Sequence, residues 1–462
     1  MKNTITQHLK DKKFYLIGIG GAGMMGIAEL LNNLGFLVRG SDINESAAIK
    51  RLRKLKIKVF IGHNPKNINS NDIIIYSNAI MKSNTELNFA RLNNMTVLSR
   101  MEILSELMRF KYGISVTGSH GKTTTTSLLS HILYKNKLDP TYLIGGKLKT
   151  DDPHVKLGNS NYLITETDES DPRFTILKPH LVVLTNLDKE HLENYNNSYK
   201  NLETSMREFI NSIPFYGQAF INGDDSNSLK LLKSINRKTF TYGFRANNEL
   251  RAHDVTYSKQ IMKFNLSYNN KLFSVSTNLL GKHNVYNILA AISVGIHLEI
   301  EIEKIIKYVS NFYGASRRFD LYKATINGKV ITIIDDYGHH PTEIECTIRT
   351  IKDIFPSKKI TMVYQPHRYS RTKATWKSLI LVLKDINNIM LLPTYSAGEK
   401  RNIYNSNFLY KKLKNKNKRV LKSLNNITDQ INKNIDDQSV LLLQGAGDIK
   451  NIISQIKTRD YN

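Results

Sequence analysis

The stretch GSHGKTTTT, from Gly118 to Thr126, has the residue types of a phosphate-binding loop. Glycines let backbone N–H groups approach phosphates, a lysine neutralises their charge, and a threonine hydroxyl reaches a magnesium ion. The longer loop pattern G-x-x-x-x-G-K-[ST] would need glycine where this chain has Val116. The apolar run before the loop and the helical pattern from Lys122 onward place it between a strand and a helix. The sequence therefore predicts a nucleotide site of a shorter pattern, with a chance Gly-Lys-Thr as the alternative.

Acidic side chains follow the next apolar strand, where a magnesium site of this kind needs them. Glu166 ends the run YLITE, and Asp168, Glu169 and Asp171 follow in the same loop. Carboxylates at such a strand end bind magnesium in nucleotide sites. A solvated acidic turn is the alternative for one or two of them. His191 follows the neighbouring strand LVVLTN and is a candidate ligand of a second metal, although a lone histidine is more often packed or at the surface.

A second glycine-rich turn lies near the N-terminus. Gly18, Gly20 and Gly23 form G-x-G-x-x-G between an expected strand and helix, and Asp42 ends the following strand. This spacing is the dinucleotide fingerprint, in which glycines let the backbone approach a diphosphate at a helix N-terminus. The same physics accepts NAD or a UDP-sugar, and a tight turn without a ligand is the alternative.

Three segments are expected to position these motifs, and each alternates apolar strand-like runs with helical patterns. The fold class is α/β, with three domains and largely parallel sheets, at residues 1–108, 109–312 and 313–462. Ligands of such sheets bind at the carboxyl ends of the strands. In the third segment DDYGHHPTE, QPHRYSRT, PTYSAGE and QGAGDI each follow a strand. Sites are therefore expected in the central and last segments.

Composition limits the class of protein. The chain has 462 residues and a net charge of +26, but its lysines are scattered, apart from residues 410–422, and no nucleic-acid-binding signature appears. We favour compositional drift over a nucleic-acid partner. The single cysteine, Cys346, excludes an internal disulfide and fits a reducing compartment. The opening residues lack the apolar core of a secretory signal, and the apolar stretch VYNILAAISVGIHL is shorter than the roughly 20 residues of a membrane span. A cytoplasmic location without membrane insertion is expected.

The chain resembles the Mur ligase family over nearly its whole length. The motifs that carry the resemblance occur in the family's order: GIGGAGMMGIAE, GSHGKTTTT, ETDESD, GKHNVYNILAA, RRF, DDYGHHPTE, QPHRYSRT, AGE and GAGDI. The ATP loop of this family has the short G-x-x-G-K-T pattern, so Val116 is no defect. Two departures are visible. Ser119 replaces the usual threonine and keeps a hydroxyl, and Glu190 precedes His191 where aspartate is common, which would shift the second metal slightly.

The resemblance implies a Rossmann-like N-terminal domain for a UDP-sugar, a central P-loop ATPase, and a Rossmann-like C-terminal domain on the amino-acid side. The catalytic residues that it implies are Lys122, Glu166, His191 and Arg318. The ATP-binding residues are Gly118, Ser119, His120, Gly121, Lys122, Thr123, Thr124, Asn284, Asn287, Arg318 and Asp336. The UDP-sugar residues are Gly20, Gly21, Gly23, Asp42 and His63. The residues on the amino-acid side are His340, His367, Arg368 and Arg371. Two Mg²⁺ ions are implied, with the ligands Thr123, Glu166 and His191. The alternatives are an ordinary basic pair at Arg317 and Arg318, and a packing role for His339 and His340.

The activity that the resemblance implies is ATP-dependent ligation of L-alanine to the lactyl carboxylate of UDP-N-acetylmuramate through an acyl phosphate, in peptidoglycan precursor synthesis. Arg368 or Arg371 would hold the alanine carboxylate, and the protein would be a monomer or weak homodimer. ETDESD together with DDYGHHPTE favours this branch over a ligase that recycles a murein tripeptide. An NAD-dependent oxidoreductase explains only residues 14–42. A non-catalytic nucleotide-binding protein would not need the motifs of the third segment.

Overall fold

A computed structural model describes residues 12–77, 79–145, 155–326, 328–423, 427–435 and 438–456, and the backbone of 458–460. Residues 1–11, on which the expectation of no secretory signal rests, lie outside this part. The described chain divides into two compact units. The first contains the described parts of Met1–Val255, Lys263–Asn278 and Asn284–Ala315. The second contains those of Thr256–Met262, Leu279–His283 and Ser316–Asn462.

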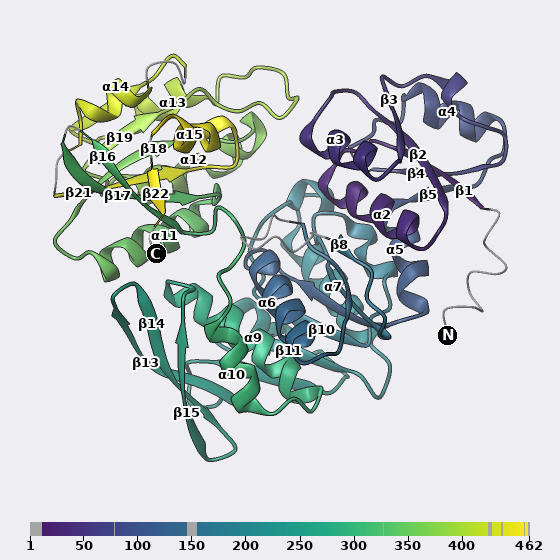
Figure 1. Ribbon diagram of the computed structural model, residues 1–462, viewed down its shortest axis with the longest axis horizontal. Coiled ribbons are helices and arrows are strands. Elements are labelled where there is room, and N and C mark those ends of the chain that lie inside the picture. Colours follow the sequence, from purple (N-terminus) through teal and green to yellow (C-terminus); the bar gives the residue numbers. More distant parts are fainter. Residues whose placement is uncertain are drawn as a thin grey trace. The chain divides into compact units, whose positions relative to one another are not determined.

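The first sheet is parallel and is covered by helices on both faces (Figure 1). Its strands are β1 (Lys13–Ile17), β2 (Leu37–Asp42), β3 (Lys58–Ile61), β4 (Asp72–Tyr76) and β5 (Val97–Ser99). Its helices are α2 (Ala22–Asn33), α3 (Ala47–Lys54), η1 (Pro65–Asn67), α4 (Thr85–Leu92) and α5 (Arg100–Arg109). The strand order is β3-β2-β1-β4-β5. Phe14 and Leu16 belong to a core cluster with residues of α2, α3 and α5, whereas Tyr15 and Ile17 belong to one with residues of α4. This alternation along β1 places helices on opposite faces.

In the part of the chain that the structure describes, the central sheet has ten strands and carries the GSHGKTTTT loop. Its strands are β6 (Tyr112–Thr117), β7 (Thr141–Leu143), β8 (Val155–Lys156), β9 (Tyr162–Glu166), β10 (Leu181–Leu184), β11 (Gln218–Asn222), β12 (Thr239–Gly243), β13 (Leu250–Ser258), β14 (Ile261–Tyr268) and β15 (Lys271–Thr277). Its helices are α6 (Lys122–Lys135), η2 (Pro172–Ile176), η3 (Leu192–Tyr195), α7 (Tyr199–Asn211), α8 (Ser226–Leu232), α9 (Lys282–His297) and α10 (Ile302–Ser310). The order is β15-β14-β13-β12-β11-β10-β6-β9-β7-β8, and the pairs around β6 are parallel.

In the described part of the chain the last sheet has seven strands. Two antiparallel strand pairs lie at one end of this sheet, and the other described pairs are parallel. Its strands are β16 (Asp320–Ile326), β17 (Lys329–Asp336), β18 (Lys359–Tyr364), β19 (Asn388–Leu391), β20 (Asn417–Val420), β21 (Ser439–Gln444) and β22 (Thr458–Asp460). Its helices are α11 (Pro341–Ile354), α12 (Tyr369–Leu383), α13 (Ser406–Lys412), α14 (Ile427–Asn432), η4 (Asp448–Asn451) and α15 (Ile452–Gln455). The order is β20-β19-β18-β21-β17-β16-β22.

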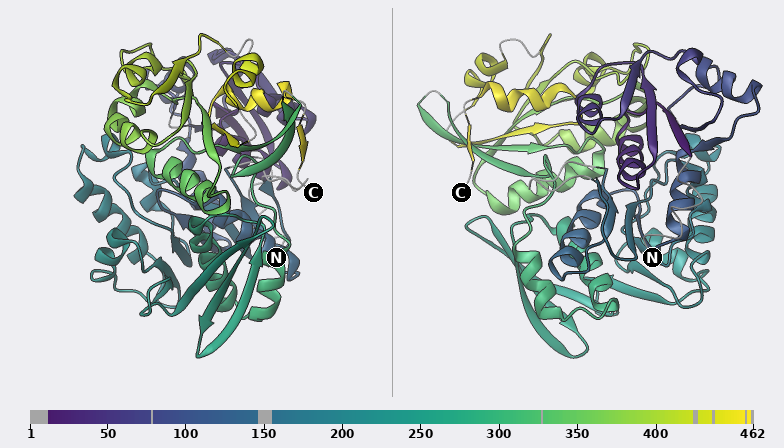
Figure 2. Two further views of the ribbon diagram at one scale, coloured as in Figure 1. Left: turned by 90° about the vertical axis from the view of Figure 1, so that its left-hand side faces the viewer. Right: turned by 45° about the vertical axis from the view of Figure 1, so that its right-hand side comes forward.

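The sequence prediction of α/β segments with largely parallel sheets is confirmed. Strands β11 to β15 were not predicted. The last three of them, teal to green in Figure 2, alternate buried with exposed or half-buried positions, so they lack the continuous apolar runs by which the other strands were recognised. One continuous core joins the first and central sheets within the first unit. The domain boundaries at 108 and 312 stay a prediction. Among the helices that the structure describes, none has both the length and the apolar character needed to cross a bilayer.

Candidate active site

The phosphate loop leaves the carboxyl end of β6 and turns directly into α6. Gly118 and Gly121 have φ values of +123° and +84°, which side-chain-bearing residues rarely adopt. A Cβ atom at Gly118 would lie 2.3 Å from Thr185 Oγ1, and one at Gly121 would lie 2.3 Å from Asn287 Oδ1. Gly121 is also the N-cap of α6 and has no side chain to satisfy the first N–H groups of that helix. These N–H groups and the helix dipole favour an anion at this point.

The end of β10 holds the loop in shape. The N–H of His120 donates to Asn186 Oδ1 at 2.9 Å, and Thr185 Oγ1 donates to the carbonyl of His120 at 2.6 Å. Ser119 Oγ accepts from the N–H of Asp188 at 2.8 Å. The loop is therefore fixed by the neighbouring strand, as a preformed phosphate site requires.

Lys122 folds back over the loop that precedes it. Its Nζ donates to the carbonyls of Gly118 and Ser119 at 2.5 and 3.2 Å, and to Glu169 Oε2 at 2.9 Å. Burial lowers the pKa of the ammonium, but the carboxylate of Glu169, supported by Asp168, more than offsets this and raises the pKa above its usual value. Lys122 is therefore held as a buried cation at the loop.

Thr123 and Glu166 form a pair of oxygen donors that suits a magnesium ion. Thr123 Oγ1 lies 3.1 Å from Glu166 Oε2, and the other carboxylate oxygen accepts from the N–H of Gly145 at 2.8 Å. Thr124, the next residue of α6, is buried. A hydroxyl and a carboxylate at this spacing can share one Mg²⁺.

The acidic loop after β9 is not a solvated turn. Glu169 and Asp171 are buried, with exposed fractions of 1% and 4%. Glu169 pairs with Lys122, whereas Asp171 caps η2 and binds Arg173 at 3.1 Å. The alternative of solvation for one or two of these carboxylates therefore fails for these two, because both have cationic partners inside the protein.

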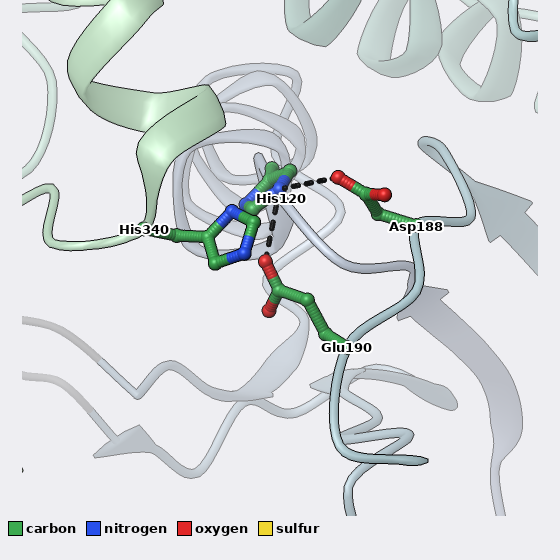
Figure 3. Close-up of side chains that lie close together, drawn as sticks. All are labelled: His120, Asp188, Glu190 and His340. Carbon is green, nitrogen blue, oxygen red and sulfur yellow. Dashed lines mark ion pairs between the residues drawn. The ribbon is translucent and has the colours of Figure 1, made fainter. Parts of the chain in front are cut away.

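His120 lies with two carboxylates of the loop after β10 (Figure 3). Its Nε2 is 3.1 Å from Glu190 Oε1 and 3.6 Å from Asp188 Oδ2. His191 adopts a left-handed backbone at φ +54°, and its Nε2 lies 3.8 Å from Glu190. A second metal at His191 stays a prediction. Sequence reasoning did not place Asp188 and Glu190 beside His120, although the acids of NLDKEH follow a strand end and were the available signal.

Helix α9 brings two amides to the back of the loop. Asn287 Nδ2 donates to Asn284 Oδ1 at 3.0 Å, and Asn287 Oδ1 accepts from Thr125 Oγ1 at 3.3 Å. Both asparagines are buried. Since a Cβ atom at Gly121 would meet the Asn287 side chain, these asparagines of the expected ATP site lie next to the loop.

The glycine turn of the first sheet is fastened to the end of β2. The N–H groups of Gly18 and Ile19 donate to the carbonyl of Ser41 at 2.9 and 3.0 Å, and the N–H of Gly20 donates to Asp42 Oδ2 at 2.8 Å. Gly21 is the N-cap of α2. Gly20 shows why glycine is needed. A Cβ at Gly20 would lie 2.9 Å from Asp42 Oδ2, which is held by its hydrogen bond from the Gly20 N–H, and 2.9 Å from Ile49 Cδ1. His63 lies at the same edge, in the turn after β3, with Nδ1 3.0 Å from Ser41 Oγ.

In the second unit, Arg317 and Arg318 have different partners. Arg317 Nε lies 2.9 Å from Asp335 Oδ2, and Arg318 Nη1 lies 3.3 Å from Glu343 Oε1. Burial raises the pKa of Asp335 to about 6, against the lowering effect of Arg317. Asp336 is buried and accepts from the N–H groups of Phe319 and Gly338 and from Gln444 Nε2, at 3.0, 2.8 and 2.7 Å. The two arginines are therefore no ordinary surface pair, since each is partly buried and pairs with a carboxylate.

Histidines and arginines gather at the carboxyl ends of β17 and β18. His340 is the N-cap of α11. The rings of His339 and His367 lie 5.3 Å apart, and His367 Nδ1 is 3.1 Å from Arg371 Nη1. Arg368 has a positive φ of +68° and donates from Nε to Glu399 Oε1 at 2.7 Å. His367, Arg368 and Arg371 thus lie together, and Glu399 is a partner that sequence reasoning did not identify.

Most of the chain matches three models of one protein family. The descriptions are Mur ligase family, catalytic domain, at residues 13–112, Mur ligase middle domain at 116–295, and Mur ligase, glutamate ligase domain at 317–447. A UDP-N-acetylmuramate--L-alanine ligase of Hydrogenovibrio crunogenus is 41% identical over 98% of this chain and 100% of its own length. The chain belongs to the Mur ligase family.

Other relatives of this Mur ligase carry the same or a related name. A UDP-N-acetylmuramate--L-alanine ligase of Aquifex aeolicus is 40% identical, and 95% of each chain is covered. The crystal structure of the UDP-N-acetylmuramate-alanine ligase of Thermotoga maritima superposes with a TM-score of 0.80 at 26% identity, over 96% of this chain and 97% of that one. A murein peptide ligase of Psychrobacter arcticus has a TM-score of 0.71 at 21% identity, over 96% and 98% of the two chains, and shows the shared fold alone.

Proposed function

We propose that this Mur ligase joins L-alanine to the lactyl carboxylate of UDP-N-acetylmuramate, with ATP converted to ADP and phosphate, in peptidoglycan precursor synthesis. The observation that carries the chemistry is the short phosphate loop, with Lys122 and the Thr123–Glu166 pair at the N-terminus of α6. The alanine branch is supported by the names and near-complete coverage of the relatives that are about 40% identical.

The reaction needs activation, because a carboxylate at neutral pH resists attack by an amine. The lactyl carboxylate oxygen attacks the γ-phosphorus of ATP, and the bond to the β-phosphate oxygen breaks, which gives an acyl phosphate and ADP. The neutral amine of L-alanine then attacks the acyl carbon, phosphate leaves, and the amine loses a proton. Lys122 and the N–H groups of the loop and of α6 stabilise the phosphate charge of the first step.

Magnesium would be held by Thr123 Oγ1 and Glu166, whose 3.1 Å separation fits a shared ion. A bound Mg²⁺ would offset the charge of the β- and γ-phosphates. A second ion at His191 remains a prediction. The carboxylate of Glu190, the residue before His191, lies 3.1 Å from His120 Nε2.

The residues proposed for the UDP-sugar, for the rest of ATP and for L-alanine follow the carboxyl ends of strands in the first and last sheets. Gly20, Gly21, Gly23, Asp42 and His63 would bind the UDP-sugar, and Arg318 and Asp336 would reach ATP. Arg371, or Arg368 after release from Glu399, would bind the alanine carboxylate in a bidentate contact. A monomer or weak homodimer and a cytoplasmic location also remain predictions.

The decisive assay is phosphate release from Mg-ATP, with UDP-N-acetylmuramate and L-alanine added singly and together. We expect release only with both substrates and its loss in Lys122→Ala. Release with a preformed tripeptide in place of L-alanine, and none with L-alanine, would replace this function by that of the recycling ligase. A folded protein that releases phosphate with neither acceptor would be a nucleotide-binding protein without ligase activity.

A further inference from the structure

A fully buried carboxylate lies at the carboxyl edge of the first sheet and has no part in the contacts described above. Glu86, in the first turn of α4, has an exposed fraction of 0%. Among the described residues no lysine or arginine pairs with it, and its only ionisable ion-pair partner is His63. Burial of a carboxylate is costly unless its oxygens are fully hydrogen-bonded. The position of Glu86 therefore needs a specific set of partners.

Both oxygens of Glu86 have such partners. Tyr15 Oη and the N–H of Asn64 donate to Oε1 at 2.7 and 3.1 Å. Ser41 Oγ donates to Oε2 at 2.5 Å, and His63 Nδ1 lies 2.9 Å from the same oxygen. The partners come from β1, β2 and the turn after β3. One carboxylate thus ties together three segments that end at the same edge of the sheet.

This network fixes the proton on His63. Nδ1 lies 2.9 Å from Glu86 Oε2 and 3.0 Å from Ser41 Oγ. Because the hydroxyl hydrogen of Ser41 points to Glu86, both neighbours present lone pairs to Nδ1. Nδ1 therefore carries a hydrogen, and Nε2 is the nitrogen left for other contacts. Within the part of the chain that the structure describes, Nε2 has no hydrogen-bond partner, and the side chain is 14% exposed.

The same network supports the glycine turn. The carbonyl of Ser41 accepts from the N–H groups of Gly18 and Ile19, and the carbonyl of Asp42 accepts from the N–H of Gly62 at 2.8 Å. Ser41 thus binds Glu86 through its side chain and the glycine turn through its backbone. His63 and the glycine turn are parts of one edge, where a parallel sheet binds its ligand.

We propose that Glu86 is a positioning residue for the UDP-sugar and acts through His63. It holds the ring with Nδ1 protonated, so that the lone pair of Nε2 accepts a hydrogen bond from a hydroxyl or from the uracil N–H of the nucleotide-sugar. The proposal rests on the proposed function, because it takes UDP-N-acetylmuramate as the ligand.

The test is a double-mutant cycle in the full chain with Glu86→Gln, His63→Ala and both together. We measure the binding of UDP by calorimetry, and the KM of UDP-N-acetylmuramate and the kcat in the ligase assay. In Glu86→Gln we expect UDP binding to weaken and that KM to rise by about tenfold, the size of one charge-assisted hydrogen bond. The kcat and the KM of ATP should stay within about twofold. In the His63→Ala background the same change should have almost no further effect.

Two control variants separate positioning from folding. Tyr15→Phe removes a donor to Oε1 but leaves the His63 side of the carboxylate intact. Glu29→Gln changes another buried carboxylate of this domain, which pairs with Arg51 at 2.6 Å. Both should lower the thermal stability and leave UDP binding unchanged. If Glu86→Gln does not fold, Ser41→Ala serves in its place in the same cycle, because it removes the hydroxyl that contacts Nδ1 and donates to Oε2.

A loss of UDP binding that is equally large with and without His63 would overturn the proposal and give Glu86 a purely structural role. Unchanged UDP binding in Glu86→Gln would overturn it as well. Failure of the proposed function has a different signature. The natural chain would then release no phosphate with UDP-N-acetylmuramate and L-alanine. UDP calorimetry needs no turnover and would still test the effect of Glu86 on UDP binding.

Discussion

The ion pair between Lys122 and Glu169 makes a testable prediction about nucleotide binding. Nζ and Oε2 are 2.9 Å apart, and Glu169 is 1% exposed. At this distance and an effective dielectric constant of about 20, the Coulomb attraction is about 6 kcal/mol before desolvation is subtracted. Glu169→Gln keeps an acceptor oxygen, and the carbonyls of Gly118 and Ser119 still accept from Nζ. We therefore expect the free energy of unfolding to fall by about 2 kcal/mol, less than the cost of an uncompensated buried charge.

The same substitution should strengthen nucleotide binding. In the free protein Lys122 is held by Glu169, and phosphates that recruit the lysine must compete with this carboxylate. Removal of the competing negative charge frees the ammonium, so we expect Mg-ADP to bind about tenfold more tightly, or about 1.4 kcal/mol. Calorimetry with Mg-ADP gives the dissociation constant, and urea denaturation gives the stability.

A matched control is Asp171→Asn in the same loop. Asp171 is also buried, but it pairs with Arg173. This variant should lose stability without any gain in nucleotide affinity. Weaker or unchanged Mg-ADP binding in Glu169→Gln would refute the idea that Glu169 competes with the phosphates. It would indicate instead that Glu169 holds Lys122 in its binding position.

Four further predictions concern the loop, its metal, the second unit and the amino-acid side. Gly121→Ala should abolish measurable ATP binding and cost more than 2 kcal/mol of stability, because its Cβ would lie 2.3 Å from Asn287. Gly35→Ala, with φ +92° and open space around the position, should cost only about 1 kcal/mol and leave ATP binding unchanged. Thr123→Val should raise the Mg²⁺ concentration needed for half-maximal phosphate release by about tenfold, whereas Thr123→Ser should leave it near the natural value. Burial lowers the pKa of His283 to about 4, so the unfolded chain binds a proton below pH 6.5 that the folded chain does not. Its contribution to the free energy of unfolding is therefore lost as the pH falls from 6.5 to 4, by about 1 kcal/mol per pH unit. In urea denaturation, the free energy of unfolding of His283→Gln should fall less steeply over this pH range, by the same amount per pH unit. Glu399→Gln should release Arg368 and change the KM of L-alanine, and an altered KM of ATP instead would argue against the placement of Arg368 on the amino-acid side.

The main features of the fold followed from local patterns in the sequence. Apolar runs that end in polar loops identified β1, β6, β9 and β10, and β17, β18, β19 and β21 of the last sheet, because buried parallel strands are apolar on both faces. The short polar strand β20 was not predicted. Strands β13 to β15 alternate buried and exposed residues and carry polar side chains, and they were therefore missed.

The candidate site divides in the same way. Glycine, lysine and threonine at fixed spacing determined the phosphate loop, since its backbone geometry is local and only glycine tolerates Gly118 and Gly121 at their φ values. The type and order of the motifs likewise led to the family. The partners of these side chains could not be predicted from local sequence patterns. The contacts of Lys122 with Glu169 and of His63 with Glu86 join residues that are far apart in the chain. Only the parallel packing of strands brings their ends to one edge, so the tertiary structure alone decided which carboxylate Lys122 and His63 each meet.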